Sequence, residues 1–248
     1  MSIQTILVSQ PEPESNKNPY TALAEKYKLK IDFRPFIHVE GVDKSEFRSQ
    51  RVDLQDHTAV ILTSKTAVDH YFRIAEECRF EVPTSMKYFC ISEAVAYYLQ
   101  KYVTYRKRKI FHGRQTIVDL IDSIKKHKKE KFLLPCSDIL RDSIPNTLDK
   151  NEIDYQKVVL YRTVASDLSD LESVSYDVLV FFSPSGIESL LKNFPDFKQN
   201  KTLIAAFGPT TAKAIVDNNL RLDIHAPQPQ TPSMSMAIEQ YIKDQKKK

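Results

Sequence analysis

The sequence predicts a two-lobed α/β protein in which parallel sheets are flanked by helices. Three observations support this fold class. Short apolar runs alternate with amphipathic segments of helix length along the 248 residues. The order of these units repeats in the two halves of the chain. Two further extended segments would form a two-stranded β connector, and two connected lobes would leave a cleft between them.

The predicted strands are apolar throughout instead of alternating, which is typical of strands covered on both faces. They span residues 5–8, 59–62, 88–91, 132–134, 158–161, 178–182 and 203–207. The predicted helices span residues 20–27, 67–78, 93–102, 117–126, 140–151, 186–193 and 210–219. Strand–helix alternation of this kind favours right-handed βαβ units and parallel sheets.

The repeat is visible in two pairs of segments. Residues 59–68 (AVILTSKTAV) match residues 178–187 (VLVFFSPSGI), and residues 88–96 (YFCISEAVA) match residues 204–212 (IAAFGPTTA). Both members of each pair read as a strand, a short turn and the start of a helix. The matched units lie about 115 to 125 residues apart, roughly the size of a small α/β domain. Two related lobes explain this spacing, although chance similarity between two α/β segments is an open alternative.

The connector sets the predicted domain boundaries. Residues 36–40 follow Pro35 and are expected to be extended, as are the β-branched and aromatic residues 158–164. These two segments are the predicted hinge. Domain 2 is then residues 41–157, and the discontinuous domain 1 combines residues 1–35 and 165–248.

Composition argues against several classes of protein. No apolar run approaches the roughly 20 residues that span a bilayer, and no signal peptide is recognisable, so a cytoplasmic protein without membrane contact is expected. The net charge is +4, and the basic runs 105–109 and 125–131 are explained as solvated helix ends, so nucleic acid is not an expected partner.

Metal and nucleotide sites also lack support in the sequence. The three cysteines, Cys78, Cys90 and Cys136, have no metal-ligand spacing, and the six histidines are scattered singly. The four glycines form no dinucleotide or Walker motif. We therefore expect neither a metal nor a nucleotide cofactor, and nothing in the sequence requires more than a monomer.

The candidate binding site lies in the loops that follow the strands, because open parallel sheets bind ligands beyond the carboxyl ends of their strands. These loops are rich in small hydroxyl residues, and free N–H groups at helix N-termini favour anions. A purely structural role as helix N-caps is the alternative. The candidates are Thr63, Ser64, Lys65, Ser92, Ser183, Ser185, Gly186, Gly208, Pro209, Thr210 and Thr211.

Several segments resemble landmarks of the uroporphyrinogen-III synthase family, in the same order along the chain. The most specific are residues 181–187 (FFSPSGI), 205–213 (AAFGPTTAK) and 226–232 (APQPQTP). Residues 6–11 (ILVSQP), 59–64 (AVILTS) and 159–163 (VLYRT) match less specific landmarks. The family has a discontinuous two-domain layout joined by a two-stranded ladder, similar to the arrangement deduced above.

The resemblance implies a substrate, a reaction and a catalytic residue. The substrate would be hydroxymethylbilane, a linear tetrapyrrole with many carboxylates, which the enzyme closes to uroporphyrinogen III with loss of water and inversion of ring D. No cofactor or metal takes part in this reaction. Tyr161 matches the family tyrosine thought to assist loss of the hydroxyl, and the loops around Ser185 and Thr210 would bind acetate or propionate groups through amides and hydroxyls.

Two positions depart from the family pattern. Gln10 stands where the family usually has arginine, and Val95 stands where a threonine is common. Two other hypotheses stay open, and the departures support the first of them. One is a non-enzymatic two-lobed protein that binds an anionic metabolite. The other is a nucleic-acid-binding module that uses the basic runs 105–109 and 125–131.

Overall fold

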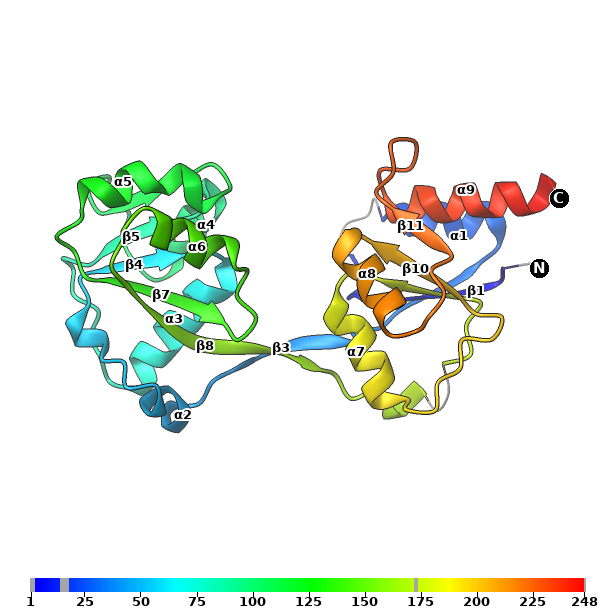
Figure 1. The fold of residues 1–248 in the computed structure, drawn as a ribbon, viewed down its shortest axis with the longest axis horizontal. Coiled ribbons are helices and arrows are strands. Elements are labelled where there is room, and N and C mark those ends of the chain that lie inside the picture. Colours follow the sequence, from blue (N-terminus) through cyan, green and yellow to red (C-terminus); the bar gives the residue numbers. More distant parts are fainter. Residues whose placement is uncertain (1–2, 14–17, 172–173, 248) are drawn as a thin grey trace. The chain divides into compact units, whose positions relative to one another are not determined.

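The computed structural model of the chain describes residues 3–13, 18–171 and 174–247. These residues form two compact units (Figure 1). Unit 1 comprises Met1–His38 and Val164–Lys248, and unit 2 comprises Val39–Thr163. The divisions fall inside the two segments predicted as the hinge, and movement at that hinge stays a prediction.

Unit 1 contains a five-stranded parallel sheet in the order β11-β10-β9-β1-β2. The strands are β1 (Thr5–Val8), β2 (Lys30–Phe33), β9 (Val178–Phe181), β10 (Leu203–Phe207) and β11 (Ile224–Ala226). Strand β1 lies between β2 and β9, so the N-terminal segment completes a sheet built mostly from the C-terminal third.

Helices cover both faces of this sheet, as its continuous apolar strands require. The helices are α1 (Pro19–Tyr27), α7 (Pro184–Asn193), α8 (Pro209–Asp217) and α9 (Met234–Lys247), with the 3₁₀ turn η4 (Ser169–Leu171) before β9. Ile6 and Val8 pack with α1 and α9 on one face. Leu7, between them in sequence, packs with α7 and α8 on the other, because successive strand residues point to opposite faces (Figure 1).

Unit 2 is built around a second sheet, in the order β3-β8-β7-β4-β5-β6. The strands are β3 (Ile37–Gly41), β4 (Ala59–Leu62), β5 (Lys87–Cys90), β6 (Ile110–His112), β7 (Phe132–Ser137) and β8 (Tyr155–Ala165). The strands from β8 to β6 pair in parallel. The strand pair β3–β8 is antiparallel, since Val42 N–H donates to the Leu160 carbonyl and Ser166 N–H donates to the Phe36 carbonyl.

Two helical layers cover this sheet as well. One face packs against α2 (Lys44–Ser49), α3 (Lys65–Glu77), α4 (Glu93–Tyr98) and the turn η2 (Leu99–Lys101). The other packs against η3 (Ile117–Leu120), α5 (Ile121–Lys126) and α6 (Ser143–Lys150). The turn η1 (Leu54–Asp56) precedes β4. The predicted α/β class with helix-flanked sheets is therefore confirmed.

Most predicted elements are present, with two kinds of difference. The helix expected at 93–102 ends at Tyr98 and continues as a 3₁₀ turn, and the one expected at 117–126 begins as a 3₁₀ turn. The short strands β2, β6 and β11 and the helices α2 and α9 were not predicted. Among the described residues, no helix combines the length and the apolar composition needed to cross a membrane.

Candidate functional site

In unit 2 the predicted loop residues follow the carboxyl ends of neighbouring strands. Thr63 and Ser64 come directly after β4, and Ser92 follows β5, which pairs with β4. Ser64 Oγ accepts the Ala67 N–H at 3.0 Å, and Ser92 Oγ accepts the Val95 N–H at 3.4 Å. Both serines are therefore N-caps, as the structural alternative proposed. A cap occupies only one of the first N–H groups of its helix and leaves the others free for a ligand.

Tyr161 lies at the same edge of the unit 2 sheet. It sits on β8 opposite Ser137, the last residue of β7. Its phenol oxygen is 3.2 Å from Ser64 Oγ, so one hydroxyl both caps α3 and contacts Tyr161. The Tyr161 side chain is buried, and burial raises the pKa of its phenol above the ordinary value.

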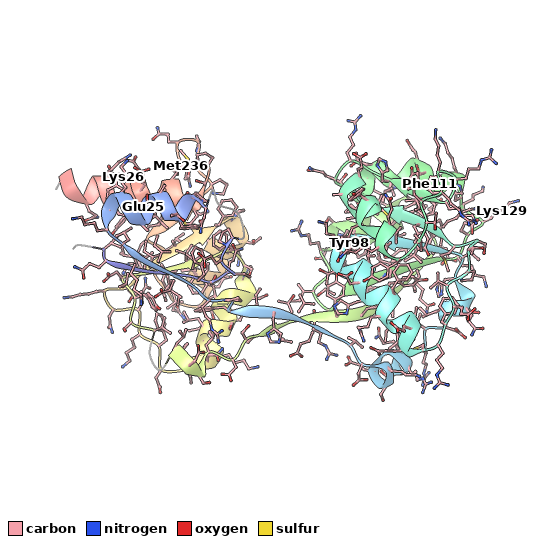
Figure 2. The ribbon with its side chains drawn as sticks, turned by 180° about the vertical axis from the view of Figure 1, so that it is seen from behind. Glu25, Lys26, Tyr98, Phe111, Lys129 and Met236 are labelled. Carbon is pink, nitrogen blue, oxygen red and sulfur yellow. The ribbon has the colours of Figure 1, made fainter. Side chains whose placement is uncertain are left out.

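Thr63 lies in the loop before α3, and Lys65 is the first residue of the helix. Lys65 is exposed, and its ammonium lies 5.4 Å from the centre of the Tyr98 ring, the side chain labelled in Figure 2. The Tyr98 hydroxyl donates to the Asp69 carboxylate, with 2.8 and 2.9 Å to its two oxygens. Thr63 is half-buried. This loop therefore offers one cation beside the free amides of α3.

A second cation lies at this edge of the sheet and was not predicted. An open cavity beyond the end of β6 is lined by Glu93, His112, Gly113, Arg114 and Asp119. The Arg114 side chain is exposed there. Sequence reasoning missed it because strand β6 has only three residues and was not recognised, so the residues that follow it were not read as a strand-end loop.

In unit 1 the Ser183–Gly186 turn follows β9 and begins α7. Ser183 Oγ accepts the Gly186 N–H at 3.3 Å, and Pro184 occupies the first turn, where its missing N–H costs nothing. Gly186 is buried, and a Cβ added there would lie 3.2 Å from the Phe181 ring and 3.8 Å from Ser9 Oγ. Ser9, buried at the end of β1, was not among the predicted residues. Ser185 is half-buried.

The Gly208–Thr211 turn follows β10 and begins α8. Gly208 has φ +88° and ψ 153°, a conformation that only glycine adopts readily, and no side chain caps this helix. Pro209 and Thr210 are exposed. Thr211 is 1% exposed as a whole residue, and its role in ligand binding stays a prediction.

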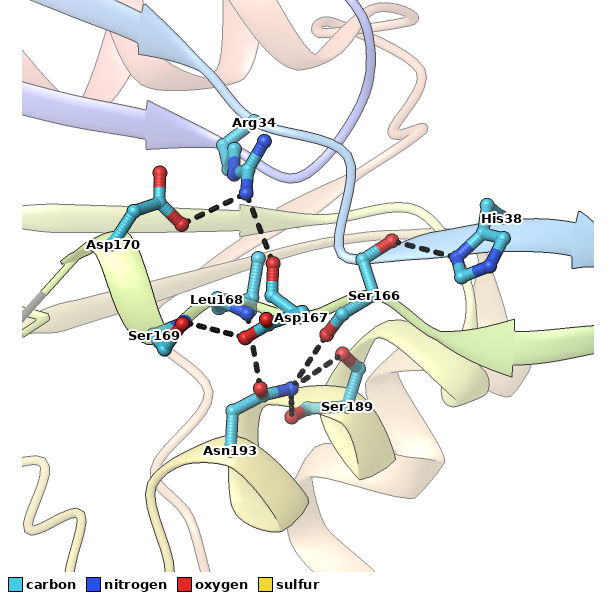
Figure 3. Close-up of polar contacts among 9 residues, drawn as sticks. All are labelled: Arg34, His38, Ser166, Asp167, Leu168, Ser169, Asp170, Ser189 and Asn193. Atoms are coloured by element: carbon cyan, nitrogen blue, oxygen red, sulfur yellow. Dashed lines mark hydrogen bonds and ion pairs between the residues drawn. The ribbon is translucent and has the colours of Figure 1, made fainter.

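A largely buried polar network holds the second half of α7 (Figure 3). Ser189 Oγ donates to the Phe36 carbonyl at 2.5 Å. Asn193 Nδ2 donates to the Ser166 carbonyl at 2.9 Å, and its Oδ1 accepts the Leu168 N–H at 3.1 Å. The helix that starts at the Ser183 turn is therefore bound to both connecting segments where they enter unit 1.

The same view shows how those segments are held at the surface of unit 1. Arg34, just after β2, donates to the Asp167 carbonyl at 2.9 Å and pairs with the Asp170 carboxylate at 2.8 Å (Figure 3). His38 Nδ1 lies 3.1 Å from Ser166 Oγ. These contacts lie where the two connecting segments enter unit 1, and none of them involves a residue of the strand-end loops.

The structure thus brings the predicted residues together in two sets. Ser64 and Tyr161 are in direct contact in unit 2, and Thr63, Lys65 and Ser92 lie on loops of the same sheet edge. Ser183, Ser185 and Gly186 share one turn of unit 1, and Gly208–Thr211 form the turn after the adjacent strand β10. Of the two departures from the family pattern, Gln10 is exposed just beyond β1, whereas Val95 packs in the core of unit 2.

The chain is similar to known proteins in sequence and in fold. A family model described as "Uroporphyrinogen-III synthase HemD" matches residues 18–235. A Saccharomyces cerevisiae protein named uroporphyrinogen-III synthase is 31% identical over 139 residues, and this alignment spans 50% of this chain and 50% of the yeast protein.

Two solved structures share the fold. Uroporphyrinogen-III synthetase from Helicobacter pylori is 16% identical with a TM-score of 0.61, and the match covers 97% of this chain and 99% of that one. A mutant uroporphyrinogen III synthase from Thermus thermophilus is 15% identical with a TM-score of 0.52, covering 99% and 100%. Identities this low establish the fold alone. The family model spans most of the chain, however, and the chain therefore belongs to the uroporphyrinogen-III synthase family.

Proposed function

We propose that this protein closes hydroxymethylbilane to uroporphyrinogen III, with loss of water and inversion of the terminal pyrrole ring D. Family membership supports the reaction. The observation that carries the proposal is the Tyr161 phenol, held 3.2 Å from Ser64 Oγ at the carboxyl edge of the unit 2 sheet. Parallel sheets bind their ligands at that edge.

Tyr161 is the proposed acid. Its proton moves to the terminal hydroxyl of the bilane as the C–O bond breaks, so that water leaves and a phenolate remains. Ring D then attacks, through its substituted carbon, the methylene carbon that lost the hydroxyl, which gives a spiro intermediate. The bond from ring D to its original bridge breaks, and reclosure at the free carbon of ring D leaves the ring inverted. The closure releases a proton that restores the phenol. Proton transfer of this type contributes about 10²- to 10⁴-fold to a rate.

The strand-end loops are the proposed sites for the substrate carboxylates. The first turns of α3, α7 and α8 each present backbone N–H groups at the positive end of a helix dipole, which favours an anion. Lys65 adds a cation in unit 2. Such contacts would fold the flexible bilane so that the substituted carbon, rather than the free one, lies within reach of the reacting centre.

The isomer composition of the product tests this function directly. The protein is supplied with freshly generated hydroxymethylbilane, and the products are oxidised to porphyrins and separated. We expect the type III isomer in excess over a control with heat-inactivated protein. Type I alone, which spontaneous closure gives, would overturn the proposal. Bilane binding without any type III product would instead favour the non-enzymatic binding protein.

The cytoplasmic location and the monomeric state stay predictions. Cell fractionation tests the first. Light scattering of the purified protein tests the second, and we expect a mass close to the 28.7 kDa of one chain.

A further inference from the structure

Helix α3 contacts Tyr161 at two points. Ser64, its N-cap, lies beside the phenol oxygen. His70, farther along the same helix, stacks on the Tyr161 ring with the centroids 5.1 Å apart and an angle of 19° between the planes. The hydroxyl and the face of the ring are therefore both held by one helix.

His70 is itself fixed by Arg73, nearly one turn further along α3. The Arg73 Nε–H donates to His70 Nδ1 at 3.1 Å, and Arg73 Nη1 pairs with the Glu77 carboxylate at 2.5 Å. An Nδ1 that accepts a hydrogen bond belongs to a neutral imidazole. Burial, followed by the nearby Arg73 charge, lowers the pKa of His70, which is consistent with this neutral form.

Arg73 also holds the backbone beside Tyr161. Its Nη2 donates to the Val42 carbonyl at 2.7 Å and lies 3.3 Å from the carbonyl oxygen of Leu160, the residue before Tyr161. A Cβ at Gly41 would lie 2.8 Å from Arg73 Cζ, so glycine leaves room for the guanidinium. One side chain thus supports the ring of Tyr161 through His70 and its strand through Leu160.

We propose that His70 and Arg73 are positioning residues that hold the Tyr161 phenol in line with Ser64 and with the departing hydroxyl of the substrate. Neither residue needs to touch the substrate. The inference rests on the proposed function of Tyr161 as the acid. Such support matters because a displacement of about 1 Å at a reacting group can cost about 100-fold in rate.

The kinetic test is a double-mutant cycle between His70 and Tyr161. His70→Ala should lower kcat by about 10- to 100-fold with little change in KM, because the ring loses its support. In a Tyr161→Phe background the same substitution should change kcat by less than about twofold, because no phenol remains to be positioned. An equal loss in both backgrounds, or no loss in either, would overturn the inference.

Two further variants separate positioning from folding. His70→Phe keeps a ring against Tyr161 but loses the Arg73 acceptor, so it should retain more activity than His70→Ala. His127→Ala is the matched control, because the His127 ring packs on the Phe111 ring elsewhere in unit 2, with 4.6 Å between the ring centroids. Loss of the His127 ring should leave kcat unchanged. If His70→Ala does not fold, the cycle is run with His70→Phe and Arg73→Lys. A wild-type kcat for both would contradict the proposal.

A spectroscopic test is independent of activity. The Tyr161 ring signal is identified in the NMR spectrum of ¹³C-tyrosine-labelled protein by its absence from Tyr161→Phe. It should shift in His70→Ala and stay in place in His127→Ala. A wild-type protein that forms only the type I isomer would refute the proposed function, whereas an unmoved Tyr161 signal would refute the positioning role.

Discussion

Tyr161 and helix α3 share one hydroxyl: Ser64 Oγ lies 3.2 Å from the phenol oxygen and accepts the Ala67 N–H at 3.0 Å. The residue proposed as the acid is therefore attached to the start of the helix whose first turn is proposed to bind carboxylates. A change at either partner should be measurable at the other.

Tyr161→Phe removes the proton donor but keeps the ring that packs on His70. We expect kcat to fall by about 100-fold while the melting temperature stays within a few degrees of wild type, because no apolar contact is lost. Steady-state kinetics and thermal unfolding measure the two effects. Tyr176→Phe is the matched control, since its hydroxyl bonds Asp32 at 2.9 Å in unit 1. An unchanged kcat in Tyr161→Phe would remove the phenol from the reaction.

Ser64→Ala removes a cap and a phenol contact together. Loss of the cap should lower the free energy of unfolding by about 1 kcal/mol. Asp43→Ala is the control for the cap alone, because Asp43 Oδ1 accepts the Glu46 N–H at 2.8 Å at the start of α2. We expect similar losses in urea unfolding but a lower kcat only in Ser64→Ala. Equal kcat values for the two variants would show that the Ser64–Tyr161 contact has no catalytic role.

Gly208→Ala tests the backbone at the start of α8. Nothing lies within 4 Å of an added Cβ, so any loss of stability must come from the φ of +88°. A side chain in this region of φ and ψ costs about 1–3 kcal/mol. Urea unfolding should therefore show a lower stability for Gly208→Ala and little change for the exposed Thr210→Ala. Equal stability of Gly208→Ala and wild type would mean that the turn relaxes without cost.

Glu239→Gln tests a pH-dependent link between α1 and α9. Hydrogen bonds from Lys26, at 2.7 Å, and from Lys243 lower the pKa of the Glu239 carboxyl from 4.5 to about 2. A lowered pKa stabilises the folded state above the unfolded-state value of about 4.3, and this contribution is lost as pH falls through about 2. The link is largely solvent-exposed, so the contribution at neutral pH should be below about 1 kcal/mol.

The measurement is urea unfolding of Glu239→Gln and wild type between pH 7 and pH 2. The difference in stability should be constant above about pH 5, then shrink towards pH 2. Glu25→Gln, on the exposed side of α1, controls for the loss of one negative charge (Figure 2). A difference that does not change with pH would contradict the assignment.

The sequence was sufficient for the central part of the fold. Strands such as β4 and β9, buried along their whole length, have continuous apolar sequences that leave little doubt about their environment. The unrecognised strands β6 and β11 have three residues each and lie at sheet edges. Three residues are too few to show a period, so only pairing with a neighbour defines them as strands.

Prediction of the candidate site from the sequence was limited in a similar way. Ser64 and Ser183 could be placed at strand ends because each lies within two residues of the end of an apolar run. Tyr161 was a catalytic candidate only because of the family resemblance. Its contact with His70 joins residues 91 positions apart and depends on how α3 crosses β8, which no local pattern encodes.

The discontinuity of unit 1 has a consequence for synthesis on the ribosome. Unit 2 is contiguous, from Val39 to Thr163, and all of it is translated before β9. Strand β1 cannot pair with β9 during this time, because its partner residues on β9 begin at Val178. The β9 side of β1 therefore stays unpaired while unit 2 is synthesised, and an unpaired apolar strand is prone to associate with other chains.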